Sequence, residues 1–165
     1  MKNDYTSIAE NYSEWAFNLK NSDIPESVQH KLQIIVMDSL GLMASAKKEP
    51  YVVSLIDALK EIGDCVVVGH EHKTSPFNAS IINGTSVHGE DFDDTFEGTP
   101  VHVGAVMVPA MLSVVQTNNL SGQEFLRGLA IGSELICRLA LVAPTAVHRQ
   151  GFHPTAIFGA FGSSI

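Results

Sequence analysis

Positive charge is scarce in this 165-residue sequence, above all in its second half. Ten Lys and Arg oppose eighteen Asp and Glu, so the formal net charge is −8. All the lysines lie at or before Lys73, and the basic residues that follow are Arg127, Arg138 and Arg149. Nucleic-acid binding depends on clustered Lys and Arg that displace counterions from the phosphates. The composition therefore predicts that the protein has no nucleic-acid partner.

Paired cysteines, a secretion signal and a membrane span are also missing from the sequence. Cys65 and Cys137 lie in apolar stretches without metal-type spacing, which favours buried free thiols. The first fifteen residues, MKNDYTSIAENYSEW, lack the apolar core of a signal peptide. No apolar run approaches the roughly 18 residues that a membrane span needs. We therefore expect a cytoplasmic protein with no membrane partner.

Charged residues of either sign are few for a short chain. They make up 17% of the sequence, hydrophobic residues make up 45%, and the mean hydropathy is +0.13. A small protein normally needs more polar surface to cover itself. The excess indicates helices that are buried on most sides, or a surface that meets a partner or further sequence.

Most of the sequence has the apolar periodicity of α-helices. We expect helices over residues 5–19, 26–43, 50–62, 76–88, 103–115 and 121–143, and a further helix that starts at residues 153–155. Pro109 either kinks the fifth of these helices or fixes its first turn. Ser121 and Glu124 form a capping-box pattern at the start of the sixth, which is apolar on nearly all sides and is expected to be central and buried.

The helical pattern predicts an all-α fold, with residues 1–165 forming one domain. Residues 65–69 are short and β-branched, and read either as a strand or as a buried extended link. The sequence ends at Ile165 within an apolar segment that has no helix-stop signal. We therefore expect the domain to be incomplete within this sequence.

A polar cluster interrupts the apolar pattern between residues 83 and 102. Among its titratable side chains, four carboxylates surround two histidines: Asp91, Asp93, Asp94 and Glu97 around His88 and His102. Hard oxygen ligands suit a divalent cation such as Mg²⁺, whereas the histidines suit proton transfer near neutral pH. The alternative is a solvated loop whose aspartates cap the next helix. A lone His153 beside Pro154 would likewise be a helix-start or packing residue.

One stretch of this cluster resembles a motif of another enzyme class. Asp93-Asp94-Thr-Phe-Glu97 matches the D-D-x-x-D/E pattern with which all-helical isoprenoid synthases bind Mg²⁺-diphosphate. Those enzymes need a second acidic motif, and the sequence contains none. We therefore rank this interpretation low.

Three motifs together resemble consecutive landmarks of the MmgE/PrpD superfamily. They are INGTSVHGEDFDDTFEG, PVHVGAVMVPAML and GFHPTAIFGAFG, and the resemblance extends over most of the chain, from about residue 5 to residue 165. The superfamily includes 2-methylcitrate dehydratases, cis-aconitate decarboxylases and iminodisuccinate epimerases. Residues 96–101 depart from the Trp- and His-containing stretch of the animal decarboxylases, and D-F-D-D-T departs from the D-F-N-D-T of enterobacterial dehydratases. These departures leave the substrate open.

The resemblance implies that residues 1–165 are the N-terminal part of an MmgE/PrpD helical domain, without the lid domain and the C-terminal part. It implies metal-independent lyase chemistry, as in a dehydratase or decarboxylase, at a carbon next to a carboxylate of a di- or tricarboxylic acid. An epimerase of the same superfamily and a truncated, non-catalytic interaction fragment are the alternatives. No cofactor is expected. The whole enzyme is expected to be a homodimer, and the fragment alone to be inactive.

The resemblance also implies roles for particular residues. His102, His153 and Asp91 correspond to catalytic positions, Thr95 corresponds to a substrate-binding position, and no residue is expected to bind metal. The family's lysine, tyrosine and further basic site residues fall outside this sequence. Without those lysines a site for several carboxylates lacks positive charge, which is a second reason to expect an incomplete domain.

Overall fold

The computed structural model describes residues 6–165, and within this range the chain is mostly helical. Its α-helices are α1 (Ile8–Asn18), α2 (Glu26–Ser45), α3 (Pro50–Ala58), α4 (Pro76–His88), α5 (Val103–Asn118), α6 (Gly122–Val142), α7 (Ala146–Arg149) and α8 (Pro154–Gly162). Two 3₁₀ turns (Asn21–Asp23 and Ala46–Lys48) and two short strands, β1 (Cys65–Val66) and β2 (Lys73–Thr74), complete the fold. The all-α prediction is confirmed.

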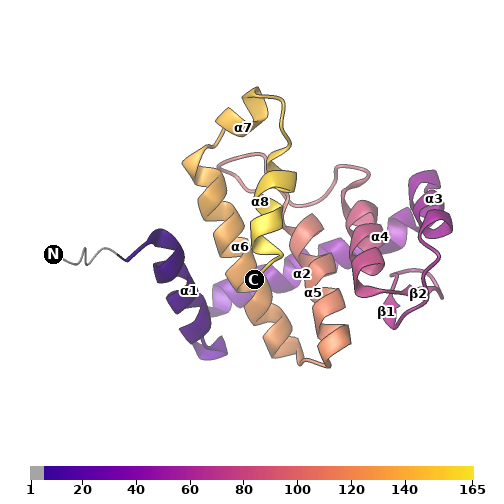
Figure 1. Ribbon diagram of the computed structural model, residues 1–165, viewed down its shortest axis with the longest axis horizontal. Coiled ribbons are helices and arrows are strands. Elements are labelled where there is room, and N and C mark those ends of the chain that lie inside the picture. Colours follow the sequence, from indigo (N-terminus) through magenta and orange to yellow (C-terminus); the bar gives the residue numbers. More distant parts are fainter. Residues whose placement is uncertain (1–5) are drawn as a thin grey trace.

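Helix α2 is the element around which the others are arranged. It crosses behind α4, α5 and α6 and joins α1 at one end of the molecule to α3 at the other (Figure 1). Buried side chains from five helices and the loop before α5 meet in one core: Leu32, Met43, Val87, Val101, Val103, Ala105, Met107, Val108, Leu129, Ile136, Ala140 and Phe158. Burial of each large side chain contributes roughly 1.5–3 kcal/mol. This core fixes the relative positions of the ends of α4, α5 and α8.

The predicted starts of α6 and α4 are confirmed, and local hydrogen bonds explain both. Ser121 accepts a bond from the amide of Glu124 at 3.2 Å, and the Glu124 carboxylate accepts one from the Ser121 amide at 2.8 Å. Ser75 caps α4 in the same sense, with Pro76 at the first helical position. Pro109 lies inside α5, so the alternative in which it fixes the first turn is wrong.

Helix α1 begins at Ile8 rather than at the predicted residue 5, which lies outside the described residues. Its predicted apolar face is not buried: Ile8 is 89% exposed and Trp15 38% exposed. Tyr12 instead reaches α6, where its hydroxyl donates to the carbonyl of Ile131. The helical period was correct, but no element packs closely on this face of the described structure.

The prediction for residues 50–69 needs two corrections. Helix α3 ends at Ala58 rather than at Ile62, which is 89% exposed. The chain leaves helical geometry at Leu59 and brings Gly63 so close to Thr74 that a Cβ there would lie 2.5 Å from its carbonyl oxygen. Of the predicted extended segment, residues 65–69, only Cys65–Val66 form a strand, and it pairs antiparallel with residues 73–74, for which no strand was predicted.

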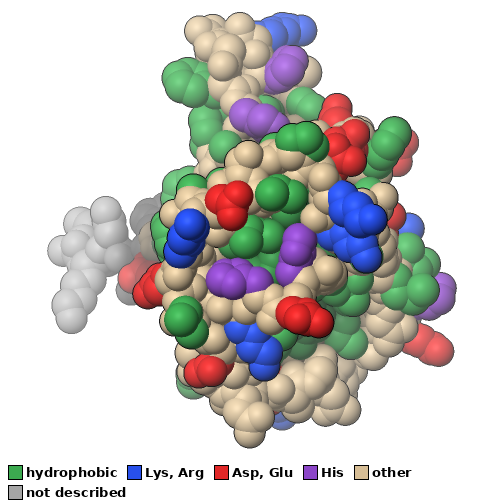
Figure 2. Space-filling model, turned by 90° about the vertical axis from the view of Figure 1, so that its right-hand side faces the viewer, with side chains coloured by type: hydrophobic (Ala, Val, Ile, Leu, Met, Phe, Trp, Pro, Cys, Tyr) green, Lys and Arg blue, Asp and Glu red, His purple; other side chains and the backbone are tan. Residues whose placement is uncertain are grey.

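A buried amide attaches this hairpin to α4. The side chain of Asn83 accepts from the amide of Val68 and donates to the carbonyl of Val66, both at 2.9 Å. These bonds satisfy backbone groups of an edge that no further strand covers among the described residues. Figure 2 shows this end of the molecule, where acidic, basic and histidine side chains are interspersed with hydrophobic ones.

Candidate functional site

Three histidines from distant parts of the sequence meet at the ends of three helices. His88 is the last residue of α4, His102 is the N-cap of α5, and His153 is the N-cap of α8. The ring centroid of His88 lies 4.7 Å from that of His102 and 5.3 Å from that of His153. The packing of α5 against both α4 and α8 produces this cluster, which we call the histidine cluster.

A buried carboxylate holds two of these rings. The side chain of Asp93 is fully buried, and its Oδ2 lies 3.0 Å from Nδ1 of His88. Its Oδ1 lies 3.4 Å from Nδ1 of His102. A carboxylate is only an acceptor when ionised, so it favours a proton on the facing nitrogen of each ring. Asp93 therefore sets the orientation of both histidines.

The structure brings the predicted site residues to this cluster by different contacts. Asp91 is in the left-handed backbone region (φ 55°), which Asp tolerates better than most residues, and its Oδ1 lies 3.7 Å from Nε2 of His102. The hydroxyl of Thr95 lies 3.5 Å from Nδ1 of the same ring. His153 contacts His88, with the two Nε2 atoms 3.1 Å apart, whereas its ring centroid is 6.3 Å from that of His102.

The resemblance assigned no site role to His88 or Asp93. Both belong to the polar cluster seen in the sequence, but the resemblance carried roles only to neighbouring positions. A signal was present in the spacing, because a histidine at a helix end followed five residues later by an acid can close a hydrogen bond across the turn. The 3.0 Å contact between these side chains is that bond.

Asp94 has a structural role, and the capping interpretation is confirmed for it. Its Oδ1 accepts a hydrogen bond from the amide of Gly104 at 2.8 Å, in the first turn of α5. Burial raises the pKa of this carboxyl, although the bond from Gly104 acts in the opposite direction. A Cβ at residue 104 would collide with Asp94, Ile35 and Ser39, so the close approach requires glycine.

Two cavities border the histidine cluster. One of about 440 Å³ is lined by Asp91, Pro100, His102, His148, Gly151, Phe152, His153 and Pro154. The other, of about 340 Å³, is lined by Gly84, Thr85, His88, Gly89, Ala105, Val106, His153, Thr155 and Ala156. Both volumes are within the range of small-molecule sites. His153 belongs to both cavities, and we call the first the His102 cavity and the second the His88 cavity.

The hydrogen bond between Thr155 and His102 fixes the helices on either side of the His102 cavity. The backbone amide of His102 donates to the hydroxyl of Thr155 at 3.0 Å. Thr155 is buried in the first turn of α8, so the bond connects the starts of α5 and α8. The two predicted catalytic histidines are thereby held relative to each other by their backbones.

The pKa values of the site favour proton transfer over thiol chemistry. Burial, followed by the nearby His88 and His102, lowers the pKa of His153 below its ordinary value of 6.5. A neutral His153 at pH 7 has a free lone pair and is able to accept a proton. Burial raises the pKa of the Cys137 thiol to about 11, which excludes a thiolate nucleophile there at neutral pH.

Four side chains of the cluster have the types of atom that bind metals. Donor atoms of His88, Asp91, Asp93 and His102 lie within 4.8 Å of one another. The 3.0 Å separation between His88 and Asp93 is that of a hydrogen bond, which accounts for the positions of these two side chains without an ion. The diphosphate interpretation is not supported, because Asp93 faces the histidines while Asp94 caps α5.

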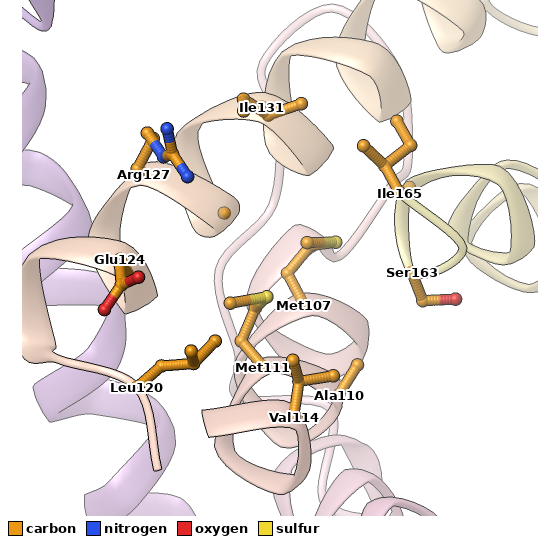
Figure 3. A pocket seen from close by; sticks show the side chains of 12 residues that line it. Met107, Ala110, Met111, Val114, Leu120, Glu124, Arg127, Ile131, Ser163 and Ile165 are labelled. Atoms are coloured by element: carbon orange, nitrogen blue, oxygen red, sulfur yellow. The ribbon is translucent and has the colours of Figure 1, made fainter. Parts of the chain in front are cut away.

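An apolar cavity of about 230 Å³ lies away from the histidines, between α5, α6 and α8. Figure 3 shows Met107 and Met111 pointing into it from α5, with Arg127 and Glu124 on α6 at its edge. The carboxylate of Glu124 is already engaged by Ser121 in the α6 cap. This cavity therefore offers apolar contact and no acid–base pair.

Among the described residues, no helix combines the length and apolarity needed to cross a membrane.

Comparison with known proteins identifies the family of the chain. The sequence profile of the MmgE/PrpD N-terminal domain matches residues 10–165. A cis-aconitate decarboxylase-like protein oryM of Aspergillus oryzae is 26% identical over 88% of this chain and 32% of its own length. Cis-aconitate decarboxylases of Aspergillus terreus and Homo sapiens are 22% and 25% identical, each over 96% of this chain and 34% of the relative. The chain spans about a third of the length of these relatives.

Proposed function

We propose that this chain, which belongs to the MmgE/PrpD family, supplies the proton-moving part of a lyase site. Two of the relatives that it matches are cis-aconitate decarboxylases, which are lyases. The substrate is a di- or tricarboxylic acid, and the reaction occurs at a carbon next to a carboxylate, as a dehydration or a decarboxylation. The observation that carries the proposal is that His102, His153 and Asp91 line one cavity of about 440 Å³.

His153 is the proposed base. Chemistry beside a carboxylate develops enolate-like charge, and a group that takes or returns a proton lowers the barrier. The lowered pKa of His153 keeps its ring neutral at pH 7, as a base requires. Its position as the N-cap of α8 places it where the helix dipole favours a bound anion.

His102 is the proposed partner acid, with Asp91 and Thr95 beside it. Asp91 lies 3.7 Å from Nε2 of His102, where a carboxylate can orient the ring and stabilise its protonated form during turnover. The Thr95 hydroxyl is 3.5 Å from Nδ1 of the ring but does not line the His102 cavity. Its proposed hydrogen bond to a substrate carboxylate rests on the resemblance alone. By resemblance, lysines outside residues 1–165 complete the binding of the anionic substrate.

An epimerase is the second candidate, and the placement of the two histidines suits it as well. His102 and His153 contribute rings 6.3 Å apart to the His102 cavity, an arrangement that suits one base and one acid on opposite faces of a carbon. A homodimer, a cytoplasmic location, and the absence of a cofactor and of a nucleic-acid partner remain predictions.

Assays of the whole protein that carries this chain test the proposal and separate the candidates. It is incubated with cis-aconitate, 2-methylcitrate or iminodisuccinate, and carbon dioxide release, dehydration and loss of optical activity are followed. We expect turnover of one of these acids, and loss of that turnover in His153→Gln. A protein with no turnover of any of the acids, or a His153→Gln variant with wild-type turnover, would overturn the proposal.

A further inference from the structure

His88 makes two contacts that the proposed reaction does not use. Its Nδ1 faces both oxygens of Asp93, at 3.1 and 3.0 Å, and its Nε2 faces Nε2 of His153 at 3.1 Å. Both distances are those of hydrogen bonds. Asp93, His88 and His153 therefore form a hydrogen-bonded chain from a buried carboxylate to the edge of the His102 cavity.

The positions of the protons in this chain follow from what each atom is able to do. Ionised Asp93 only accepts, so Nδ1 of His88 carries a proton. A neutral His88 then has a bare Nε2, and the facing Nε2 of His153 must carry the proton that lies between the rings. If His88 is protonated, its Nε2 carries the proton that lies between the rings, and Nε2 of His153 accepts the hydrogen bond. In both cases a single proton lies between the two Nε2 atoms.

We infer that His88 is a positioning residue for His153, and that the two rings act as one proton-accepting pair backed by Asp93. The inference rests on the proposed role of His153 as base, and it adds a residue for which that proposal has no function. In the resting pair, His153 carries its proton on Nε2 and presents Nδ1 as the basic atom.

Proton uptake by the pair consists of two proton transfers. The substrate C–H bond breaks, its electron pair stays on the carbon as the enolate, and Nδ1 of His153 takes the proton. The proton on Nε2 of His153 moves to Nε2 of His88. His153 ends neutral, and the new positive charge lies on His88, whose Nδ1 is 3.0 Å from the buried carboxylate of Asp93. The reverse movements return the proton.

The surroundings of the pair agree with this use. His88 borders the His88 cavity, whereas His153 borders both cavities, so the pair spans the wall between them. The other charged or titratable groups that bear on His153 are His102 from the start of α5, Asp91 from the loop after α4, and His148 from α7. Two imidazolium rings in direct contact repel each other, which disfavours a second extra proton on the pair.

Nitrogen-15 NMR of the histidine-labelled protein tests the inference without using activity. We expect His88 to be in the Nδ1–H tautomer and His153 in the Nε2–H tautomer at high pH. Both rings should then respond to a shared first protonation and to a second step at distinctly lower pH. An Nε2–H tautomer for neutral His88, or independent single titrations of the two rings, would overturn the inference.

Substitution of His88 provides the kinetic arm in the whole protein. His88→Asn keeps an amide donor for Asp93 and removes the ring from His153, whereas His88→Gln keeps a polar group near His153 that cannot be protonated. We expect both to lower kcat by about 10–100-fold, the usual effect of losing a supporting hydrogen bond, with little change in KM because His88 does not line the His102 cavity.

His30→Gln is the matched control, since His30 is exposed on α2. Wild-type kcat in folded His88→Gln and His88→Asn would overturn the inference while leaving the proposed function intact. Coupled titrations in a protein that turns over none of the acids would support the pair and overturn the proposed function instead. If neither variant folds, the tautomers and titrations of the unmodified protein still decide.

Discussion

The Asp94 carboxylate and the Gly104 amide form a 2.8 Å hydrogen bond that fixes where α5 begins. The bond also holds the loop that carries Asp91, Asp93 and Thr95, because Asp94 lies within that loop, between Asp93 and Thr95. His102 lies two residues before Gly104, so the same bond sets the start of the helix that His102 caps. A structural carboxylate therefore lies within the motif whose other residues are assigned to chemistry.

Asp94→Ala is expected to lower the free energy of unfolding by about 1–2 kcal/mol, the cost of losing a helix cap. Asp94→Asn keeps an oxygen acceptor and should cost less. Chemical denaturation at pH 7 measures both. Two equally mild effects would show that the bond to Gly104 contributes little to the stability of α5.

The raised pKa of Asp94 predicts the pH dependence of this comparison. The folded state favours the protonated carboxyl, so the stabilisation is present below the ordinary pKa of 3.8 and is lost as pH rises through the raised folded value. The side chain of the Asp94→Asn variant cannot ionise, so the variant does not lose stability in this way as pH rises. The stability of Asp94→Asn relative to wild type should therefore increase as pH rises above about 4, which denaturation curves at several pH values will show.

His102→Ala and His153→Ala should each lower turnover of the whole protein by at least about 100-fold, as expected for loss of a proton-transfer group. Variants at His30, His70, His72 and His148 should be far more tolerant. His148 is the informative member of this control set because it lines the His102 cavity with His102 and His153. Wild-type turnover in a folded His102 or His153 variant would remove that residue from the mechanism.

The lowered pKa of His153 predicts the acid limb of the rate profile. A base with a depressed pKa stays neutral to lower pH than an ordinary histidine, whose value is 6.5. The midpoint of the acid limb of kcat/KM is therefore expected below pH 6.5. A midpoint above 6.5 that disappears in His153→Gln would show that His153 is protonated at neutral pH and acts as an acid.

No stoichiometric metal is expected in the histidine cluster. The oxygens of Asp93 face His88 and His102 at hydrogen-bonding or near hydrogen-bonding distance, and the resemblance is to a metal-independent group. Elemental analysis of protein purified without added metal decides the question. One equivalent of a transition metal per chain, or activity that a chelator abolishes and Mg²⁺ restores, would contradict this prediction.

The isolated 165-residue chain is expected to self-associate and to show no lyase or epimerase activity. Phe161 is 56% exposed, Ile165 61% and Val142 83%, so each forgoes a large part of the roughly 1.5–3 kcal/mol that full burial contributes. Sedimentation and binding of a hydrophobic dye measure the association, and the carboxylic-acid assays measure the activity. A monodisperse monomer with measurable turnover would refute the prediction.

Two glycines of α6 give a matched test of how α5 and α8 pack against it. A Cβ at Gly132 would meet the side chain of Met107 and also the backbone oxygen of Gly162, at 2.8 Å, whereas one at Gly128 would meet the flexible side chain of Met111. Gly132→Ala should therefore lower the free energy of unfolding by about 1–3 kcal/mol, and Gly128→Ala by much less. Equal effects would show that α8 readily moves away from α6.

Local signals made most of the helices predictable, and long-range packing explains what was missed. The starts of α6, α4 and α8 could be read from sequence because their signals act within one turn of the same helix. These signals are Ser121 with Glu124 for α6, Ser75 with Pro76 for α4, and Pro154 for α8. The β1–β2 pairing and the exposure of Ile8 depend on which segments lie next to each other, and helical or β periodicity carries no such information.

The same distinction applies to the site. The resemblance assigned His102 and His153 because each belongs to a motif, and the structure places both at one cavity. The contact between His88 and His153 joins residues 65 positions apart. It exists only because α4, α5 and α8 pack with their relevant ends together, which neither motif records.

The hydrogen bond from the His102 amide to the Thr155 hydroxyl connects the start of α5 to α8. Helix α8 carries His153 at its start, and its outer side exposes Phe161. In the proposed mechanism a proton moves across the 3.1 Å gap between His88 and His153, and such a transfer is far slower across a gap one ångström wider. If that mechanism holds, a group that packs on the outer side of α8 and shifts this helix would change the rate of proton transfer without entering either cavity.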